Sequence, residues 1–171
     1  MKLSVIPLIS KKKGGKFSFF NELKKIFHSN NIIIENGDVL VISSKFISIS
    51  QGRILKIDNS KVCKKAKQIS KKFNSNDKFM EIVFRESDEI LGGVAGFVMS
   101  SVDGILAPNA GIDKSNSKGT EIILYPNEPY RFAEELKRKI FLEFNLHVGI
   151  IIVDSRLMPA RIGTTGVTIA C

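Results

Sequence analysis

The feature that most constrains the fold is a run of apolar residues from Val148 to Val153, interrupted only by Gly149 and followed by Asp154. The run is far too short to cross a bilayer, which needs about 20 residues, and it indicates a buried strand. Asp154 and Ser155 then stand where such a strand leaves the core and a crevice opens. A carboxylate and a hydroxyl there are suitable ligands for Mg²⁺ or Mn²⁺. On position alone, Asp154 fits the start of a plain turn equally well.

Helical and strand patterns follow one another without strict alternation, which predicts one mixed α/β (α+β) domain over residues 1–171, with a mixed sheet flanked by helices. Helices are expected at residues 17–30, 61–73, 77–90 and 129–144, with Asp77 as an N-cap and Pro129 in a first turn. Strands are expected at residues 3–9, 39–42, 97–100, 105–107, 122–125 and 147–153, and Asp103-Gly104 predicts a hairpin turn. The apolar segment 167–170 fits either an edge strand or a truncated chain.

The chain carries a net charge of +9, and lysines in residues 11–13 and 61–72 are its main source. A solvated helix face, a basic cleft for a small anion and a nucleic-acid-binding surface are the three interpretations. The lack of an aromatic RNP segment and of zinc-ligand spacing disfavours nucleic acid. Cys63 and Cys171 suggest no disulfide framework, and neither a signal peptide nor a transmembrane segment is visible. We therefore expect a cytoplasmic protein without a membrane partner.

Two further segments place polar groups where they could bind a ligand. The turn-rich loop at residues 109–116 carries Asp113 and Asn116, which offer oxygen and amide groups to a metal and a nucleotide. A surface loop with Asx turns is the alternative. Ser44 and Lys45 follow the expected strand that precedes them, and hydroxyl and ammonium groups at a strand end suit phosphate oxygens.

Arg161 is a candidate to hold a carboxylate or a phosphate through its fork of donors. Other candidates are weaker. Gly14-Gly15-Lys16 lacks the upstream glycine spacing of a Walker A loop. His28 and His147 are isolated, so no Ser-His-Asp arrangement can be assembled. Cys63 lies among lysines that could activate its thiol, but it fits an ordinary helix position better.

Taken together, the chain resembles the coenzyme F420-0:L-glutamate ligase (gamma-glutamyl ligase) family along nearly its whole length. The matching motifs are, in order, Gly37-Asp38-Val39-Leu40-Val41, Ser44-Lys45, Gly52-Arg53, Arg85-Glu86-Ser87, Asn109-Ala110-Gly111-Ile112-Asp113 with Ser115-Asn116, residues 148–155, Pro159-x-Arg161-x-Gly163 and Gly166. Each motif is weak alone. The Asn-Ala-Gly-Ile-Asp block and the Asp-Ser block with its following Pro-x-Arg-x-Gly are specific when they occur in this order.

The resemblance implies a GTP-dependent ligase that adds L-glutamate to the carboxylate of coenzyme F420-0 through an acyl phosphate, which supplies a good leaving group. It also implies Mg²⁺ or Mn²⁺, with K⁺ as a further ion, and an intertwined homodimer with GTP near the subunit boundary. Carried over position by position, it implies a catalytic role for Arg161, metal ligation by Asp113, Asp154 and Ser155, and GTP contacts from Ile9, Ser10, Lys11, Lys12, Ser44, Lys45 and Asn116.

The chain also departs from the family pattern. Leu157 and Met158 replace a glycine and an arginine, and Arg156 is a candidate to fill the same space. Ile49 and Gln51 replace a common lysine and glutamate. Family chains continue beyond this length into a stretch with further nucleotide and metal contacts, so we expect an incomplete site. A related amide ligase for another carboxylate, and a nucleotide- or nucleic-acid-binding fragment without activity, stay open as alternatives.

Overall fold

The structure is a computed structural model, and it describes residues 3–11, 13–57, 61–114, 121–158, 160 and 162–171. Its helices and strands confirm the expected mixed α/β class. In chain order they are α1 (Phe19–Ser29), β1 (Val39–Ser43), α2 (Ser44–Gln51), β2 (Ile54–Lys56), α3 (Lys64–Lys72), α4 (Asp77–Glu86), β3 (Glu89–Val94), β4 (Phe97–Val102), β5 (Ile105–Pro108), the 3-10 turn η1 (Asn109–Gly111), β6 (Glu121–Ile123), α5 (Pro129–Phe144), β7 (Gly149–Leu157) and β8 (Thr164–Ala170).

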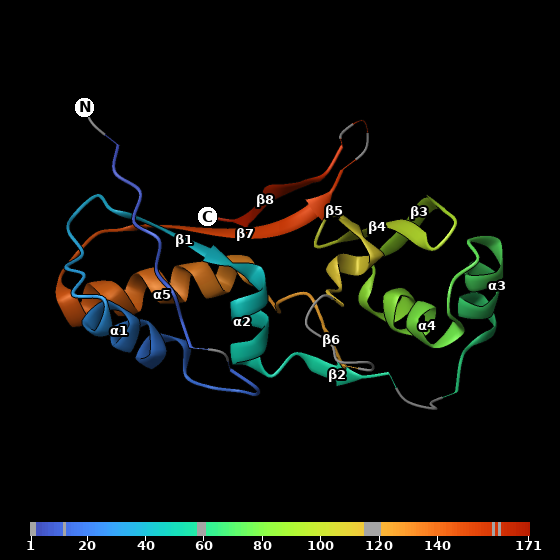
Figure 1. Ribbon diagram of the computed structural model, residues 1–171, viewed down its shortest axis with the longest axis horizontal. Coiled ribbons are helices and arrows are strands. Elements are labelled where there is room, and N and C mark those ends of the chain that lie inside the picture. The colour runs from blue at the N-terminus through green and yellow to red at the C-terminus, as the bar shows by residue number, and fades with distance from the viewer. Residues whose placement is uncertain (1–2, 12, 58–60, 115–120, 159, 161) are drawn as a thin grey trace.

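The strands in the described residues form three small sheets (Figure 1). β1 pairs in parallel with β7, and β7 pairs in antiparallel with β8. β2 and β6 form an antiparallel pair, and β3, β4 and β5 form an antiparallel meander. In Figure 1 the β1-β7-β8 sheet lies at one end of an elongated molecule with α1 and α5, and the meander lies at the other end with α3 and α4.

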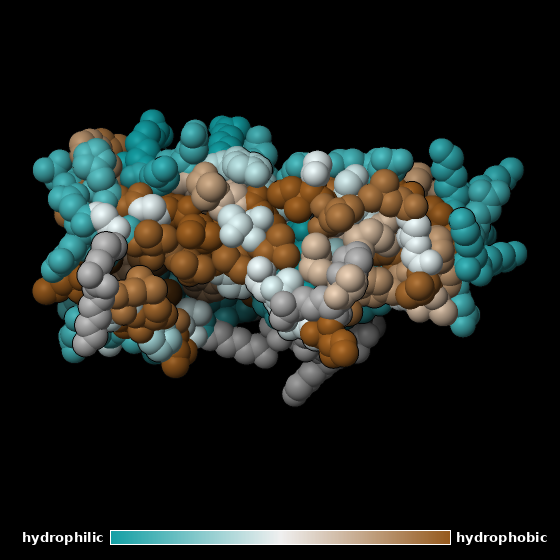
Figure 2. Space-filling model, turned by 90° about the horizontal axis from the view of Figure 1, so that it is seen from above, coloured by the Kyte–Doolittle hydropathy of each residue, from teal (hydrophilic) through white to brown (hydrophobic). Residues whose placement is uncertain are grey.

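Helix α5 packs against β7 and β8, because Ala133, Leu136 and Ile140 form an apolar stripe that is fully or almost fully buried. Helix α1 joins this layer, and its Phe19 ring meets the Phe132 ring of α5 edge to face at 5.1 Å. The opposite face of the sheet lies open in the described part of the chain, where Val41 is 66% exposed. Figure 2 shows hydrophobic side chains gathered along the middle of the molecule on the side seen from above.

The meander at the other end depends on a close approach of β3 to β4. Gly93 pairs with Val98, and a Cβ at Gly93 would lie 2.9 Å from the Cα of Val98 and in contact with the carbonyl oxygen of Phe97. A residue with a side chain would therefore push the strands apart. The tight Asp103-Gly104 turn then joins β4 to β5, as the sequence predicts.

Several predicted elements are corrected by the structure. Residues 3–9 form no strand, and the strand expected at residues 122–125 is β6, which ends at Ile123. The helix expected to reach residue 90 ends at Glu86, because the chain turns there into β3. Its N-cap is Asn76, whose side chain accepts a hydrogen bond from the Phe79 amide, so Asp77 is the first helical residue.

The end of the chain differs most from the prediction. β7 does not stop at residue 153 but continues to Leu157, because its second half pairs with β8. The segment at 167–170 belongs to β8, which lies at the edge of the β1-β7-β8 sheet. Helix α2 and strand β2 are elements that the sequence patterns did not indicate.

Candidate functional site

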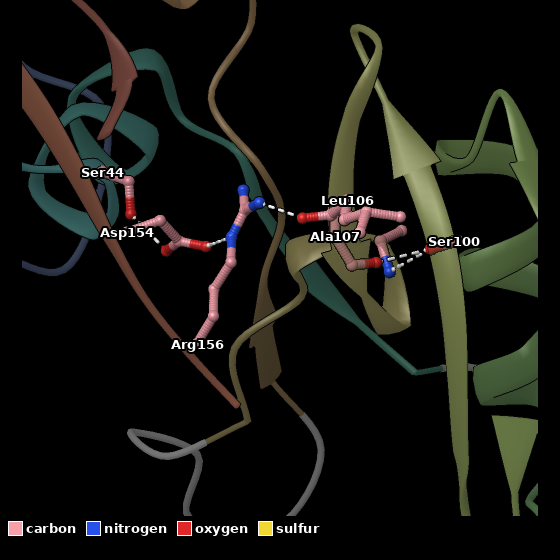
Figure 3. A network of polar contacts seen from close by, with 7 residues as sticks. Ser44, Ser100, Leu106, Ala107, Asp154 and Arg156 are labelled. Atoms are coloured by element: carbon pink, nitrogen blue, oxygen red, sulfur yellow. Dashed lines mark hydrogen bonds and ion pairs between the residues drawn. The ribbon is translucent and has the colours of Figure 1, made fainter. Parts of the chain in front are cut away.

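The candidate site lies where β1 ends and α2 begins. Ser44, the first residue of α2, is 5% exposed, and its hydroxyl donates a hydrogen bond of 2.6 Å to Oδ1 of Asp154 (Figure 3). The next residue, Lys45, forms an ion pair in which its Nζ lies 2.5 Å from Oδ2 of Asp113. Two consecutive residues at a helix N-terminus therefore hold two aspartates that are distant in the sequence.

Asp154 reaches Ser44 because β1 and β7 are parallel neighbours. Ser43 pairs with Val153, so the residues that follow them, Ser44 and Asp154, emerge at the same edge. Asp154 thus lies at the carboxyl end of the parallel pairing, as the sequence predicts, even though β7 itself continues beyond it.

Asp113 is positioned by an unusual turn after β5. Asn109, Ala110 and Gly111 all have positive φ angles, of 49°, 56° and 64°. This conformation is costly for residues other than glycine, and local hydrogen bonds hold it: the Asn109 side chain accepts from the Val98 amide at 3.0 Å. Asp113 then pairs with Ile123 through two backbone hydrogen bonds, of 2.8 and 2.9 Å.

Arg156 is the buried cation of the site, with only 3% of its surface exposed. It lies two residues after Asp154 on β7, and its Nε donates a 2.6 Å hydrogen bond to Oδ2 of that carboxylate. Its Nη1 donates to the backbone carbonyl of Leu106 in β5 (Figure 3). The guanidinium carbon also lies 5.5 Å from the centroid of the Tyr125 ring. Nη2 has no hydrogen-bond partner within the described residues.

Two neighbouring groups have pKa values shifted by the partial or full loss of water around them. Burial raises the pKa of the Tyr125 hydroxyl, and the nearby Arg156 charge opposes this shift only in part. Burial also lowers the pKa of Lys114, whose ammonium lies 3.2 Å from the centroid of the Phe79 ring. Arg156 is buried, whereas the side chain of Asp113 is 30% exposed, so the site is shielded from water on the Arg156 side only.

The chemistry of the donor set suits a hard divalent cation. Asp113, Asp154 and Ser44 offer only oxygen atoms, which Mg²⁺ and Mn²⁺ prefer. Over the described ranges, no group of three or more His, Cys, Asp or Glu side chains could hold a metal. A cation held by these three oxygen donors would take its remaining ligands from water or from a bound phosphate, as Mg²⁺ commonly does. In this structure, Lys45 and Arg156 neutralise the two carboxylates instead.

The other predicted site residues either lie away from the Ser44–Asp154 contact or fall outside the described residues. Ser155 is exposed and alternates with Asp154 along β7, so its side chain faces the other side of the ribbon. Ile9, Ser10 and Lys11 lie in the irregular segment before α1, and Ile9 is 82% exposed. The predicted site residues that lie outside the described residues are Lys12, Asn116 and Arg161.

Sequence reasoning missed the central place of Arg156. Its signal was the alternation Asp154, Ser155, Arg156, which puts the first and third side chains on one face of a strand. The sequence patterns placed the end of the strand at Val153, so residues 154–156 were not recognised as part of a strand. They also missed that Ser44 and Lys45 open a helix, whose first amide groups add to their attraction for anions.

None of the helices in the described residues is both long and apolar enough to cross a membrane. The profile of the F420-0:Gamma-glutamyl ligase family matches residues 6–171 of the chain. Three proteins named coenzyme F420:L-glutamate ligase are similar to it. The Archaeoglobus fulgidus protein is 33% identical over 141 residues, which cover 82% of this chain and 57% of the relative.

The Methanopyrus kandleri protein is 28% identical over 170 residues, which cover 99% of this chain and 65% of the relative. The Methanocaldococcus jannaschii protein is 32% identical over 138 residues, which cover 80% of this chain and 55% of the relative. The matched part of the chain thus spans between 55% and 65% of the length of these three relatives.

Proposed function

Because the chain belongs to the F420-0:gamma-glutamyl ligase family, we propose that it acts in a GTP-dependent ligase that joins L-glutamate to coenzyme F420-0. The relatives named as coenzyme F420:L-glutamate ligases support this substrate pair. One structural observation carries the proposal: Ser44 and Lys45, at the N-terminus of α2, meet both Asp154 and Asp113. Such a junction offers donors for phosphate oxygens beside oxygen ligands for a metal.

The proposed reaction has two steps. A carboxylate oxygen of F420-0 attacks the γ-phosphorus of GTP, the bond to the β–γ bridging oxygen breaks, and GDP leaves with that electron pair. The neutral amine of L-glutamate then attacks the acyl carbon of the acyl phosphate. The new amide nitrogen loses a proton, and inorganic phosphate departs from the carbon.

The residues of the site would bind and orient these anions. Lys45 and the first amide groups of α2 would hold phosphate oxygens. Asp113, Asp154 and the Ser44 hydroxyl would hold Mg²⁺ or Mn²⁺, which would offset the negative charge of the phosphate groups. Arg161 remains our proposed catalytic arginine, Ser155 a proposed metal ligand, and residues 9–12 proposed contacts to GTP. Asn116 is likewise proposed to contact the nucleotide.

Calorimetric titration of GTP into the chain, with and without Mn²⁺, tests the proposal. We expect binding only when Mn²⁺ is present, and its loss in Asp154→Asn and Asp113→Asn. Asp103→Asn is the matched control, because Asp103 lies in the β4–β5 turn at a φ of 51°, which asparagine also tolerates. GTP binding that needs no metal, or that survives both site substitutions, would contradict a metal–nucleotide site at α2.

A second hypothesis, a basic surface for nucleic acid, rests on the lysines of α3. Lys64, Lys65, Lys67, Lys71 and Lys72 are all exposed. Binding through such a surface should weaken steeply with salt and need no divalent metal. A fluorescence titration with a labelled duplex at two salt concentrations separates the two hypotheses. The homodimer, the K⁺ ion, the cytoplasmic location and the choice of F420-0 over another carboxylate stay predictions.

A further inference from the structure

A network of hydrogen bonds continues from Asp154 into the meander (Figure 3). Arg156 connects Asp154 to the carbonyl of Leu106 in β5. The next carbonyl, that of Ala107, accepts a 2.6 Å hydrogen bond from the hydroxyl of Ser100. This hydroxyl accepts in turn from the backbone amide of Ala110 at 2.9 Å. Ala110 belongs to the positive-φ turn that leads directly to Asp113.

The contacts close into a ring around the two aspartates. On one side, Asp154 and Asp113 are held by adjacent residues of α2. On the other side, they are held through Arg156 and the meander. The members of the ring are, in order, Ser44, Asp154, Arg156, residues 106–107, Ser100, residues 110–113 and Lys45. A closed ring restrains the relative position of its members more strongly than an open chain of the same contacts.

Arg156 is the member that joins two different sheets, because β7 and β5 share no ladder. Its burial and its three-sided environment fix the guanidinium: Asp154 accepts from Nε, Leu106 accepts from Nη1, and the Tyr125 ring lies alongside. A planar, multiply bonded guanidinium orients a carboxylate more rigidly than an ammonium does.

We infer that Arg156 is a positioning residue, which fixes the Asp154 carboxylate relative to Asp113 by tying β7 to the hairpin that leads to Asp113. This inference rests on the proposed metal site. The inference goes beyond the proposed metal site, because it makes Arg156 responsible for the geometry of that site although the positive charge of Arg156 disfavours a cation there. Charge alone would make a divalent metal bind more tightly when Arg156 is neutralised, whereas a positioning role makes Mg²⁺ bind more weakly.

Discrimination between Mg²⁺ and Ca²⁺ gives a readout that a general loss of stability would not produce. Mg²⁺ needs nearly ideal octahedral geometry with short bonds, whereas Ca²⁺ accepts longer and more variable ones. Substitutions behind metal ligands typically cost about 10- to 100-fold in affinity. In Arg156→Lys, which keeps the charge, we expect Mg²⁺ affinity to fall about tenfold or more. Ca²⁺ affinity should fall less than about threefold, because that ion tolerates a looser site.

The experiment measures Mn²⁺ bound to the chain by electron paramagnetic resonance, with Mg²⁺ and Ca²⁺ as competitors and without nucleotide. Ser100→Ala is the second variant, because it opens the ring at a neutral residue that contacts neither aspartate. It should shift the Mg²⁺-to-Ca²⁺ preference in the same direction as Arg156→Lys. Arg85→Lys is the matched control, since Arg85 pairs with Glu81 on α4 and does not belong to the ring.

The outcomes separate the inference from the function that it builds on. Reduced Mg²⁺ preference in both ring variants, with the control unchanged, supports a positioning role. Unchanged preference in both ring variants, with normal Mn²⁺ binding to the wild type, overturns the inference and leaves the metal site standing. Tighter Mg²⁺ binding by a folded Arg156→Met overturns it as well, because charge then outweighs geometry. No Mn²⁺ binding by the wild type overturns both.

Discussion

Replacing Lys45 with glutamine tests whether a side-chain cation occupies the place of a metal at Asp113. The ammonium lies 2.5 Å from Oδ2 of Asp113, and both side chains are 30% exposed. A divalent cation that binds this oxygen must compete with the ammonium. Removing the positive charge while keeping a polar side chain should therefore strengthen metal binding, which is the opposite of what the loss of an ordinary binding residue does.

The size of the effect follows from the exposure of the pair. Partly exposed ion pairs contribute about 0.2–1 kcal/mol, and a tenfold change in affinity corresponds to about 1.4 kcal/mol. Without nucleotide, Lys45→Gln should thus bind Mn²⁺ up to about fivefold more tightly than the wild type. With GTP present, the order should reverse, because the wild-type ammonium can move to a phosphate oxygen and leave Asp113 to the metal.

Titrations of Mn²⁺ by electron paramagnetic resonance, with and without GTP, measure both parts of this prediction. Lys24→Gln is a suitable control, because Lys24 forms a similar 2.7 Å ion pair with Glu143 between α1 and α5. Its Mn²⁺ affinity should equal that of the wild type in both conditions. Weaker or unchanged Mn²⁺ binding by Lys45→Gln in the absence of GTP would refute the competition between ammonium and metal.

Three further predictions concern stability. Gly111→Ala should lower the free energy of unfolding by about 1–3 kcal/mol in chemical denaturation, because Gly111 has a φ of 64° and an added Cβ would lie 2.7 Å from the Tyr125 ring. Tyr125→Phe should lower that free energy by less than about 1 kcal/mol, because Arg156 lies near the buried hydroxyl but no hydrogen bond of normal geometry to it is found in the ranges described; a larger loss would contradict this prediction. A hydrogen bond from the Cys63 amide lowers the pKa of Glu81 in the folded protein. The folded state should therefore lose stability, measured by thermal melts, as pH falls below about 4.3, the ordinary pKa of a glutamate. Glu81→Gln should lose less over that range.

The sequence predicted best those elements that local signals define. α5 has the expected bounds, because Pro129 suits a first helical turn and Ala133, Leu136 and Ile140 recur at helical spacing. Phe144, one helical step beyond that stripe, is 38% exposed, since it is the last residue of the helix. The β4–β5 hairpin also agrees, because Asp-Gly is a strong turn signal by itself.

Elements defined by distant partners were harder to predict. Residues 3–9 have the apolar composition of a strand but form no strand. The second half of β7 is polar, and only its pairing with β8 makes it a strand. In β3, Gly93 lets two strands come close together, and only the partner strand β4 makes this segment a strand.

The candidate site shows the same division. Asp154 and Ser44 each follow an apolar strand, and their meeting needs only that the two strands be parallel neighbours. The contact between Lys45 and Asp113 depends instead on the course of a loop with three left-handed residues. No periodic pattern describes such a loop, so its contacts cannot be read from the sequence in the same way.

The pairing of β1 with β7 has a consequence for how the chain folds. Residue 39 pairs with residue 149, so this ladder closes most of the chain into one loop. Non-local closures of this kind form slowly, whereas hairpins such as β4–β5 and adjacent helices such as α3 and α4 form early. Ser44 and Asp154 meet only through the late ladder. We therefore expect refolding chains to acquire secondary structure first and affinity for a divalent metal last, so that metal binding marks the completion of folding.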